Sequence, residues 1–204
     1  MRLPIYCFIA VLLAFGPVPS ALSAEAEQKT AGAEGKIQPA VGEILPPFGL
    51  AWGVEVRRVE EAVKTAGGHV SKRSPGEPSE ERWTVEGIAQ EGLQRVLFSF
   101  SGGRLTGVEL QYGKEDWNTK TYDDFMLTVR AELDVKHGEG RQLIRERTPA
   151  SGVLKTMLGY AWSKTDQSVA LIYFSAQDKR NLFRVISLHY AARPQRVSPQ
   201  VASR

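Results

Sequence analysis

The architecture can be inferred outward from residues 93–112, which read LQRVLFSFSGGRLTGVELQY. Apolar and polar side chains alternate on both sides of Gly102 and Gly103, as in two strands that each bury one face. Two adjacent glycines adopt the positive φ angles of a two-residue hairpin turn without a steric penalty. This stretch therefore predicts an antiparallel hairpin formed by residues 93–101 and 104–112.

The residues before this hairpin predict a helix and one further strand. Apolar side chains recur at helical spacing over residues 55–66, and Gly67-Gly68 ends the pattern. Residues 69–81 are polar and contain two prolines, so we expect a loop there. Residues 82–88 alternate again and predict a strand.

The second half of the chain repeats this order. Residues 121–136 predict a helix with Thr121 as N-cap and Asp124 at the capping-box position. The polar segment 139–151 is expected to be a loop. Residues 153–162, 168–175 and 182–190 predict three strands, of which 168–175 is nearly all apolar and therefore central.

Together these patterns predict an α+β fold. We expect two tandem helix-plus-three-strand units, residues 46–113 and 114–192, that form antiparallel sheet with the helices packed on one face. Short turns between successive strands exclude a doubly wound parallel sheet, because parallel neighbours need long crossover connections.

The N-terminal residues have the order of a secretory signal peptide. Arg2 precedes an apolar run over residues 4–16, and small residues follow over residues 20–24. We expect cleavage after Ala24, although Ser23 and Ala26 also satisfy the small-residue rule. An uncleaved N-terminal anchor is the alternative. The apolar run is too short to span a bilayer, which requires about 20 residues, so the predicted location is the periplasm or the medium.

The composition is that of an ordinary globular protein, with 42% hydrophobic and 24% charged residues. The net charge of +3 is too small for a dedicated nucleic-acid binder. The single cysteine, Cys7, lies in the predicted signal peptide, so the mature chain would have no disulfide and no thiolate metal site. Residues 25–45 are expected to be a flexible leader, and residues 193–204 a disordered basic tail.

The run from Gly53 to Val59, the helix after it and the spacing Phe100-x-x-Gly103-x-Leu105-x-x-Val108 resemble bacterial envelope domains built from a helix and an antiparallel meander. These domains include the small lipoproteins of the β-barrel assembly machinery and the tandem-repeat β-lactamase inhibitory proteins. The resemblance covers the topology of residues 48–190 but few sequence positions. This chain lacks their lipobox cysteine and disulfides. The resemblance implies a protein that binds other proteins, and it transfers no functional residue.

The motifs of common enzymes are absent from the sequence. Three histidines, His69, His137 and His189, form no H-x-x-x-H or H-E-x-x-H pattern, and neither a G-x-S-x-G elbow nor a P-loop occurs. We therefore expect no enzyme activity, no catalytic residue, no metal site and no cofactor. A pair of carboxylates that converges only in three dimensions, as in glycosidases, stays open.

If the helices cover one face of the sheet, strand alternation assigns a mixed set of side chains to the other face. That set consists of Arg95, Leu97, Glu109, Gln111, Lys155, Met157, Tyr173 and His189. Such a mixture suits protein recognition, and it equally suits a plain solvated sheet. The candidate partner-binding residues are Arg95, Glu109, Gln111, Tyr173 and His189.

Three functional hypotheses follow from the sequence. The first is a non-catalytic exported envelope protein with a protein partner. The second is a small-molecule or lipid carrier, with Phe125, Met126, Tyr160 and Trp162 lining a pocket between helices and sheet. The third is a hydrolase whose residues converge in the fold. The tryptophans are expected mainly in the core, and Trp117, in a polar run, is the best candidate for exposure.

Overall fold

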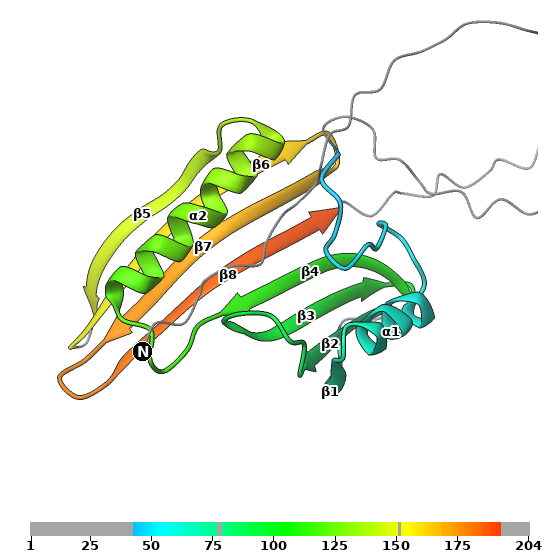
Figure 1. Ribbon diagram of the computed structural model, residues 1–204, viewed down its shortest axis with the longest axis horizontal. Coiled ribbons are helices and arrows are strands. Elements are labelled where there is room, and N and C mark those ends of the chain that lie inside the picture. The colour runs from blue at the N-terminus through cyan, green and yellow to red at the C-terminus, as the bar shows by residue number, and fades with distance from the viewer. Residues whose placement is uncertain (1–42, 77–78, 151, 193–204) are drawn as a thin grey trace, which may run out of the picture. The chain divides into compact units, whose positions relative to one another are not determined.

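The computed structural model describes residues 43–76, 79–150 and 152–192 (Figure 1). The predicted signal peptide, the leader up to residue 42 and the predicted basic tail lie outside the described residues. None of the helices described is long and apolar enough to cross a membrane.

Two helices and eight strands follow one another along the described chain. In order they are α1 (Val56–Thr65), β1 (His69–Pro75), β2 (Glu80–Glu86), β3 (Leu93–Ser101), β4 (Arg104–Tyr112), α2 (Thr119–His137), β5 (Arg141–Ala150), β6 (Val153–Lys164), β7 (Gln167–Gln177) and β8 (Leu182–Ala192). The hairpin of β3 and β4 has the predicted bounds.

All eight strands belong to one antiparallel sheet, in the order β1-β2-β3-β4-β8-β7-β6-β5 (Figure 1). The predicted fold of two helix-plus-three-strand units is therefore wrong. Four strands follow each helix, and β4 pairs with β8 along six residue pairs, from Gly107 opposite Ala191 to Tyr112 opposite Ile186. This pairing merges the two halves into a single sheet, so no boundary in the sheet separates them.

The two strands missing from the prediction, β1 and β5, form the two edges of the sheet. In β1 only Val70 and Ser74 are even partly buried, and in β5 only Ile144 among the residues whose burial is described. An edge strand that is exposed on both faces carries no apolar alternation, so its sequence resembles a polar loop.

The second helix begins at Thr119, two residues earlier than predicted, and its N-cap is Asn118 rather than Thr121. The side-chain oxygen of Asn118 accepts a hydrogen bond from the Thr121 backbone N–H at 3.0 Å. This interaction satisfies one of the free N–H groups of the first turn, and asparagine is among the best residues for it.

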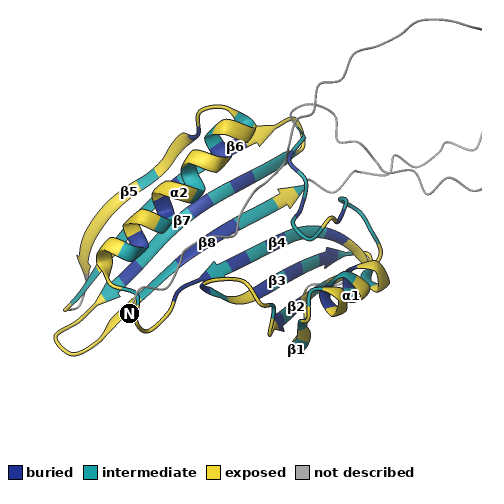
Figure 2. Cartoon of the chain, viewed as in Figure 1, coloured by how far each residue is buried: buried dark blue, intermediate teal, exposed yellow. Residues whose placement is uncertain are grey.

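One face of the sheet carries the core. A row of aligned residues crosses five strands on this face, and each member is at most 5% exposed: Val85, Val96, Leu110, Leu188 and Leu171. Both helices pack their buried side chains into the same hydrophobic cluster, α1 with Val59 and Val63, α2 with Met126 and Leu133. Figure 2 shows the buried positions alternating along the inner strands.

Residues 43–54 form a strap across the junction of the two halves. At its start, the Ile44 N–H donates to the Gln167 side chain of β7 at 2.8 Å. Further along, the Phe48 ring lies 6.2 Å from the ring of Phe98 in β3. The Trp52 indole N–H donates back to the Ile44 carbonyl at 2.7 Å. Ile44 is wholly buried, although the sequence prediction placed it in the leader.

The burial of Ile44 makes the strap testable. We expect Ile44→Ala to lower the free energy of unfolding by about 2–5 kcal/mol, since it removes buried methylene groups and leaves a cavity. Urea unfolding followed by circular dichroism measures the change. The control is Val135→Ala on α2, where the side chain is 89% exposed, and it should change stability by less than about 0.5 kcal/mol. Equal effects of the two substitutions would contradict the anchoring of the strap.

Candidate functional site

The sheet face opposite the helices, called here the open face, carries an ordered line of polar side chains. In the described part of the chain no helix covers this face (Figure 1). Arg95 Nε donates to Gln111 Oε1 at 2.6 Å, and Gln111 Nε2 donates to Glu109 Oε1. On the other side, His189 Nδ1 lies 3.7 Å from Glu109 Oε2. These four residues are called the polar row.

The backbone register brings the polar row together. Arg95 of β3 pairs with Gln111 of β4, and Glu109 of β4 pairs with His189 of β8. Directly paired residues in an antiparallel sheet have side chains close enough to interact. The polar row therefore crosses the junction between the two halves, and His189 joins it only because β4 pairs with β8.

Four of the five predicted partner-binding residues make up the polar row, and the fifth lies elsewhere. Tyr173 belongs to the helix-covered face, where its ring is 6.1 Å from that of Tyr122 in α2. Its cross-strand partner is Ile186, which is fully buried. The expectation that Tyr173 lies on the open face is therefore wrong.

Beside the polar row, the open face is apolar. Ile172 and Phe174 of β7 stand on it with Val185 of β8 and Met157 of β6, and all four are half-buried. Of these, the prediction included only Met157. The prediction missed Ile172 and Phe174 because both faces of β7 are apolar, so that alternation does not separate the two faces.

The tryptophans hold the core together. Trp83 is fully buried, and the indole N–H of Trp162 donates to Asp134 Oδ1 at 3.0 Å and to the Gly138 carbonyl at 2.8 Å.

Trp117, which the sequence analysis named as the best candidate for exposure, is half-buried, with the centre of its ring 5.1 Å from that of Phe125. A Cβ atom on Gly92 would lie 2.5 Å from this indole, so the ring packs directly on the glycine.

The four residues proposed to line a carrier pocket do not share one. Met126 and Trp162 are buried in the core, and Phe125 packs on Tyr112 with ring centroids 5.0 Å apart.

Tyr160 borders a surface hollow of about 510 Å³, and the guanidinium of Arg130 lies 3.9 Å from the centre of its ring. The rest of this hollow is lined by Glu139, Gly140, Arg141 and Gln142, and such a polar lining differs from the mostly apolar wall of a typical ligand pocket.

The polar row contains a histidine–carboxylate pair, which is part of many hydrolase sites. Ser187 stands two residues before His189 on the same strand face, but no hydrogen bond links its hydroxyl to His189 among the described residues. Nucleophilic catalysis requires that nucleophile and base lie within hydrogen-bond reach. In the same ranges no group of three or more His, Cys, Asp or Glu residues is placed to hold a metal ion.

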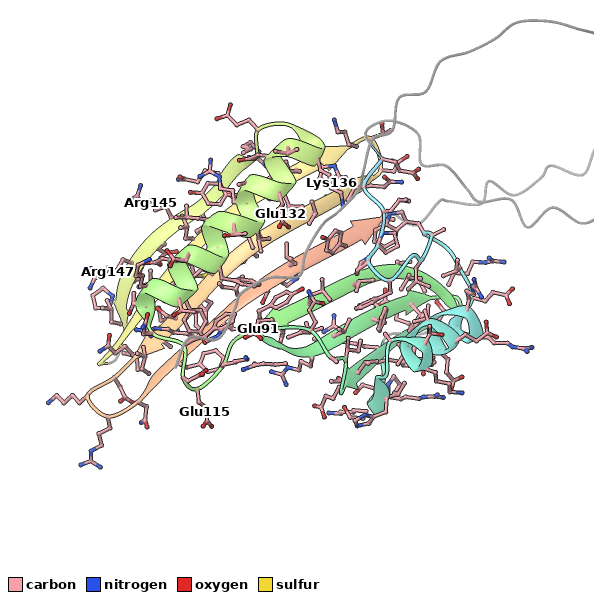
Figure 3. The ribbon with its side chains drawn as sticks, viewed as in Figure 1. Glu91, Glu115, Glu132, Lys136, Arg145 and Arg147 are labelled. Carbon is pink, nitrogen blue, oxygen red and sulfur yellow. The ribbon has the colours of Figure 1, made fainter. Side chains whose placement is uncertain are left out.

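Two tyrosines on the helix-covered face near the junction have perturbed acidities. Burial is the main cause that raises the pKa of Tyr112 to about 12, and the negative charges of Tyr190 and Glu132 add to it. A hydrogen bond from the Gln90 side chain, 3.1 Å long, opposes the shift. Burial, followed by the charge of Glu132, also raises the pKa of Tyr190. Glu132 lies on α2 (Figure 3).

Comparisons of the chain with protein-family models, with curated proteins and with solved structures find no match.

The pKa of Tyr112 predicts a loss of stability at high pH. Tyrosine normally titrates near pH 10, so between pH 10 and 12 the unfolded chain releases this proton while the folded chain keeps it. The stabilisation is complete below pH 10 and is lost as the pH rises toward 12, a change of about 2–3 kcal/mol. Urea unfolding at pH 9, 10 and 11 should show a shallower decline for Tyr112→Phe than for the wild type. The same slope in both proteins would contradict the burial of the phenol.

Proposed function

We propose that this chain is an exported, non-catalytic protein of the bacterial envelope that binds a protein partner through the open face. The observation that carries the proposal is the polar row beside uncovered apolar side chains. Protein interfaces combine aromatic and aliphatic contacts with a polar rim, and Ile172 and Phe174 next to His189 and Glu109 offer both in one region.

The polar row is ordered before any partner arrives. Glu109 accepts from Gln111, and Gln111 accepts from Arg95, so each side chain is held by its neighbour. A pre-organised surface loses less side-chain entropy on binding than a mobile one. The Glu109 side chain is only 23% exposed, and that of His189 is 40% exposed, so a partner would contact an already partly desolvated pair.

Export is supported by the sequence of the first 24 residues, and the periplasm or the medium is the proposed location. The resemblance to bacterial envelope domains of the helix-plus-meander type supports this location. Such domains bind proteins through a sheet face or loops, which supports the proposed partner.

The non-catalytic assignment is supported by the geometry around His189. The Glu109–His189 pair lies on a sheet face, and it borders none of the three hollows described, which are lined by residues of α2, β5 and β6, of α1 and β1, and of β1 to β4. A catalytic pair normally acts in a concave site that excludes water. A screen with serine-hydrolase probes addresses the remaining hydrolase alternative, and labelling that is lost in Ser187→Ala would overturn this assignment.

Crosslinking in the cell envelope tests the proposal. The protein carries a tag at its C-terminus, and crosslinked species are identified after purification. We expect one protein partner in stoichiometric amount. Arg95→Glu should lower its recovery by about tenfold or more, since the substitution reverses a charge and removes the hydrogen bond to Gln111.

Arg57→Glu on α1 is the matched control, because this arginine is 88% exposed and lies away from the open face. It should leave recovery unchanged. Recovery of the protein alone, or equal losses in both variants, would overturn the proposal. Circular dichroism of both variants establishes that each is folded.

A further inference from the structure

The turn between β7 and β8 exposes large apolar and basic side chains together. The hairpin tip is defined here as residues 177–183, and every residue in it is exposed (Figure 2). Phe183 is 54% exposed and Leu182 is 46% exposed, while Lys179 and Arg180 lie between them and the start of the turn. Figure 1 shows this turn projecting past the adjacent end of β6.

The hairpin tip is a rigid turn. Asp178 Oδ1 accepts hydrogen bonds from the backbone N–H groups of Arg180 at 2.7 Å and Asn181 at 2.6 Å. The Asp178 N–H donates to the Asn181 carbonyl at 3.0 Å. Behind the turn, the Phe183 ring lies 6.2 Å from that of Phe174. These hydrogen bonds hold the backbone of the turn from which the exposed side chains project.

A further basic side chain lies on β6, near the hairpin tip. Lys155 of β6 pairs with Ala176, which in turn pairs with Phe183, so Lys155 lies two strand spacings, about 10 Å, from Phe183. The carboxylate within the tip, Asp178, is engaged by the turn itself.

We propose that the hairpin tip binds the surface of an anionic lipid bilayer. Leu182 and Phe183 would enter the boundary between headgroups and acyl chains, and Lys179 and Arg180 would contact the lipid phosphates. Aromatic and aliphatic side chains next to basic ones are the composition of interfacial membrane contacts. The proposal differs from the open-face proposal in its partner and in the residues of the turn, and Phe183 also contacts Phe174 of the open face.

The small size of the hairpin tip favours a membrane over a protein as its partner. A stable protein interface takes about 20–30 residues and about 800 Å² from each partner, whereas the tip has seven residues. The same limit argues against a second copy of this chain. A bilayer needs no shape complementarity, and each basic residue near an anionic surface strengthens binding by about fivefold.

Co-sedimentation with lipid vesicles tests the proposal. Cells express the full 204-residue sequence, and the protein is purified as the cells process it. The vesicles contain phosphatidylcholine and phosphatidylglycerol at 3:1, or phosphatidylcholine alone. We expect at least about tenfold tighter binding to the anionic vesicles, a preference that weakens in high salt. Lys179→Ala with Arg180→Ala should weaken binding to the anionic vesicles by about 25-fold.

The apolar contribution has its own matched pair of variants. Leu182→Ser with Phe183→Ser should weaken binding to the anionic vesicles by about tenfold or more. Leu127→Ser with Val135→Ser on α2 alters side chains that are 62% and 89% exposed, and should leave binding unchanged.

Three results would overturn the membrane proposal. One is equal binding of the wild type to both kinds of vesicle. Another is an equal loss of binding in the two serine double variants. The third is an absence of vesicle binding combined with loss of a crosslinked protein in the tip variants, which would assign the tip to a protein partner instead.

Discussion

The antiparallel pairing of β4 with β8 joins the first four strands to the last four, and both faces of the sheet depend on its register. On the covered face it aligns Leu110 with Leu188, which makes the core continuous. On the open face it sets Glu109 opposite His189. A slip by one residue would turn every side chain of β8 to the other face, so the same error would break the core and the polar row together. The strap also crosses this junction, since Ile44 is hydrogen-bonded to Gln167 of β7 and Phe48 packs on Phe98 of β3.

How far the sequence predicts this fold depends on where each strand lies. The hairpin of β3 and β4 was predicted with its observed bounds, because one of its faces is buried and the other is not. The edge strands β1 and β5 were missed, since exposure on both sides leaves no apolar period to detect. Without them the predicted sheet has six strands, three after each helix, where the structure has eight. Non-local pairing such as β4 with β8 leaves no signal in a local pattern.

The face of each candidate site residue was likewise predicted correctly only where its strand has one apolar and one polar side. Arg95, Glu109 and Gln111 lie on strands with clear alternation, and their common face was predicted correctly. Tyr173 lies on β7, a central strand whose two faces are both apolar, so local alternation does not assign it to one face. Two of the residues that the prediction missed, Ile172 and Phe174, belong to the same strand. Only the pairing of β7 with β8 shows on which face of the sheet Ile172, Tyr173 and Phe174 lie.

The open face and the edges of the sheet differ in the kind of contact that they permit with another chain. The edge strands carry charges, Lys72 and Arg73 on β1 and Arg145 and Arg147 on β5, and charged edges oppose the addition of a further strand. The open face has no such protection over Ile172 and its apolar neighbours. In the proposed interaction the partner therefore contacts the face of the sheet rather than its edge, so that side chains instead of backbone groups select it. Selection by side chains is more specific, because backbone hydrogen bonds are the same for every sequence.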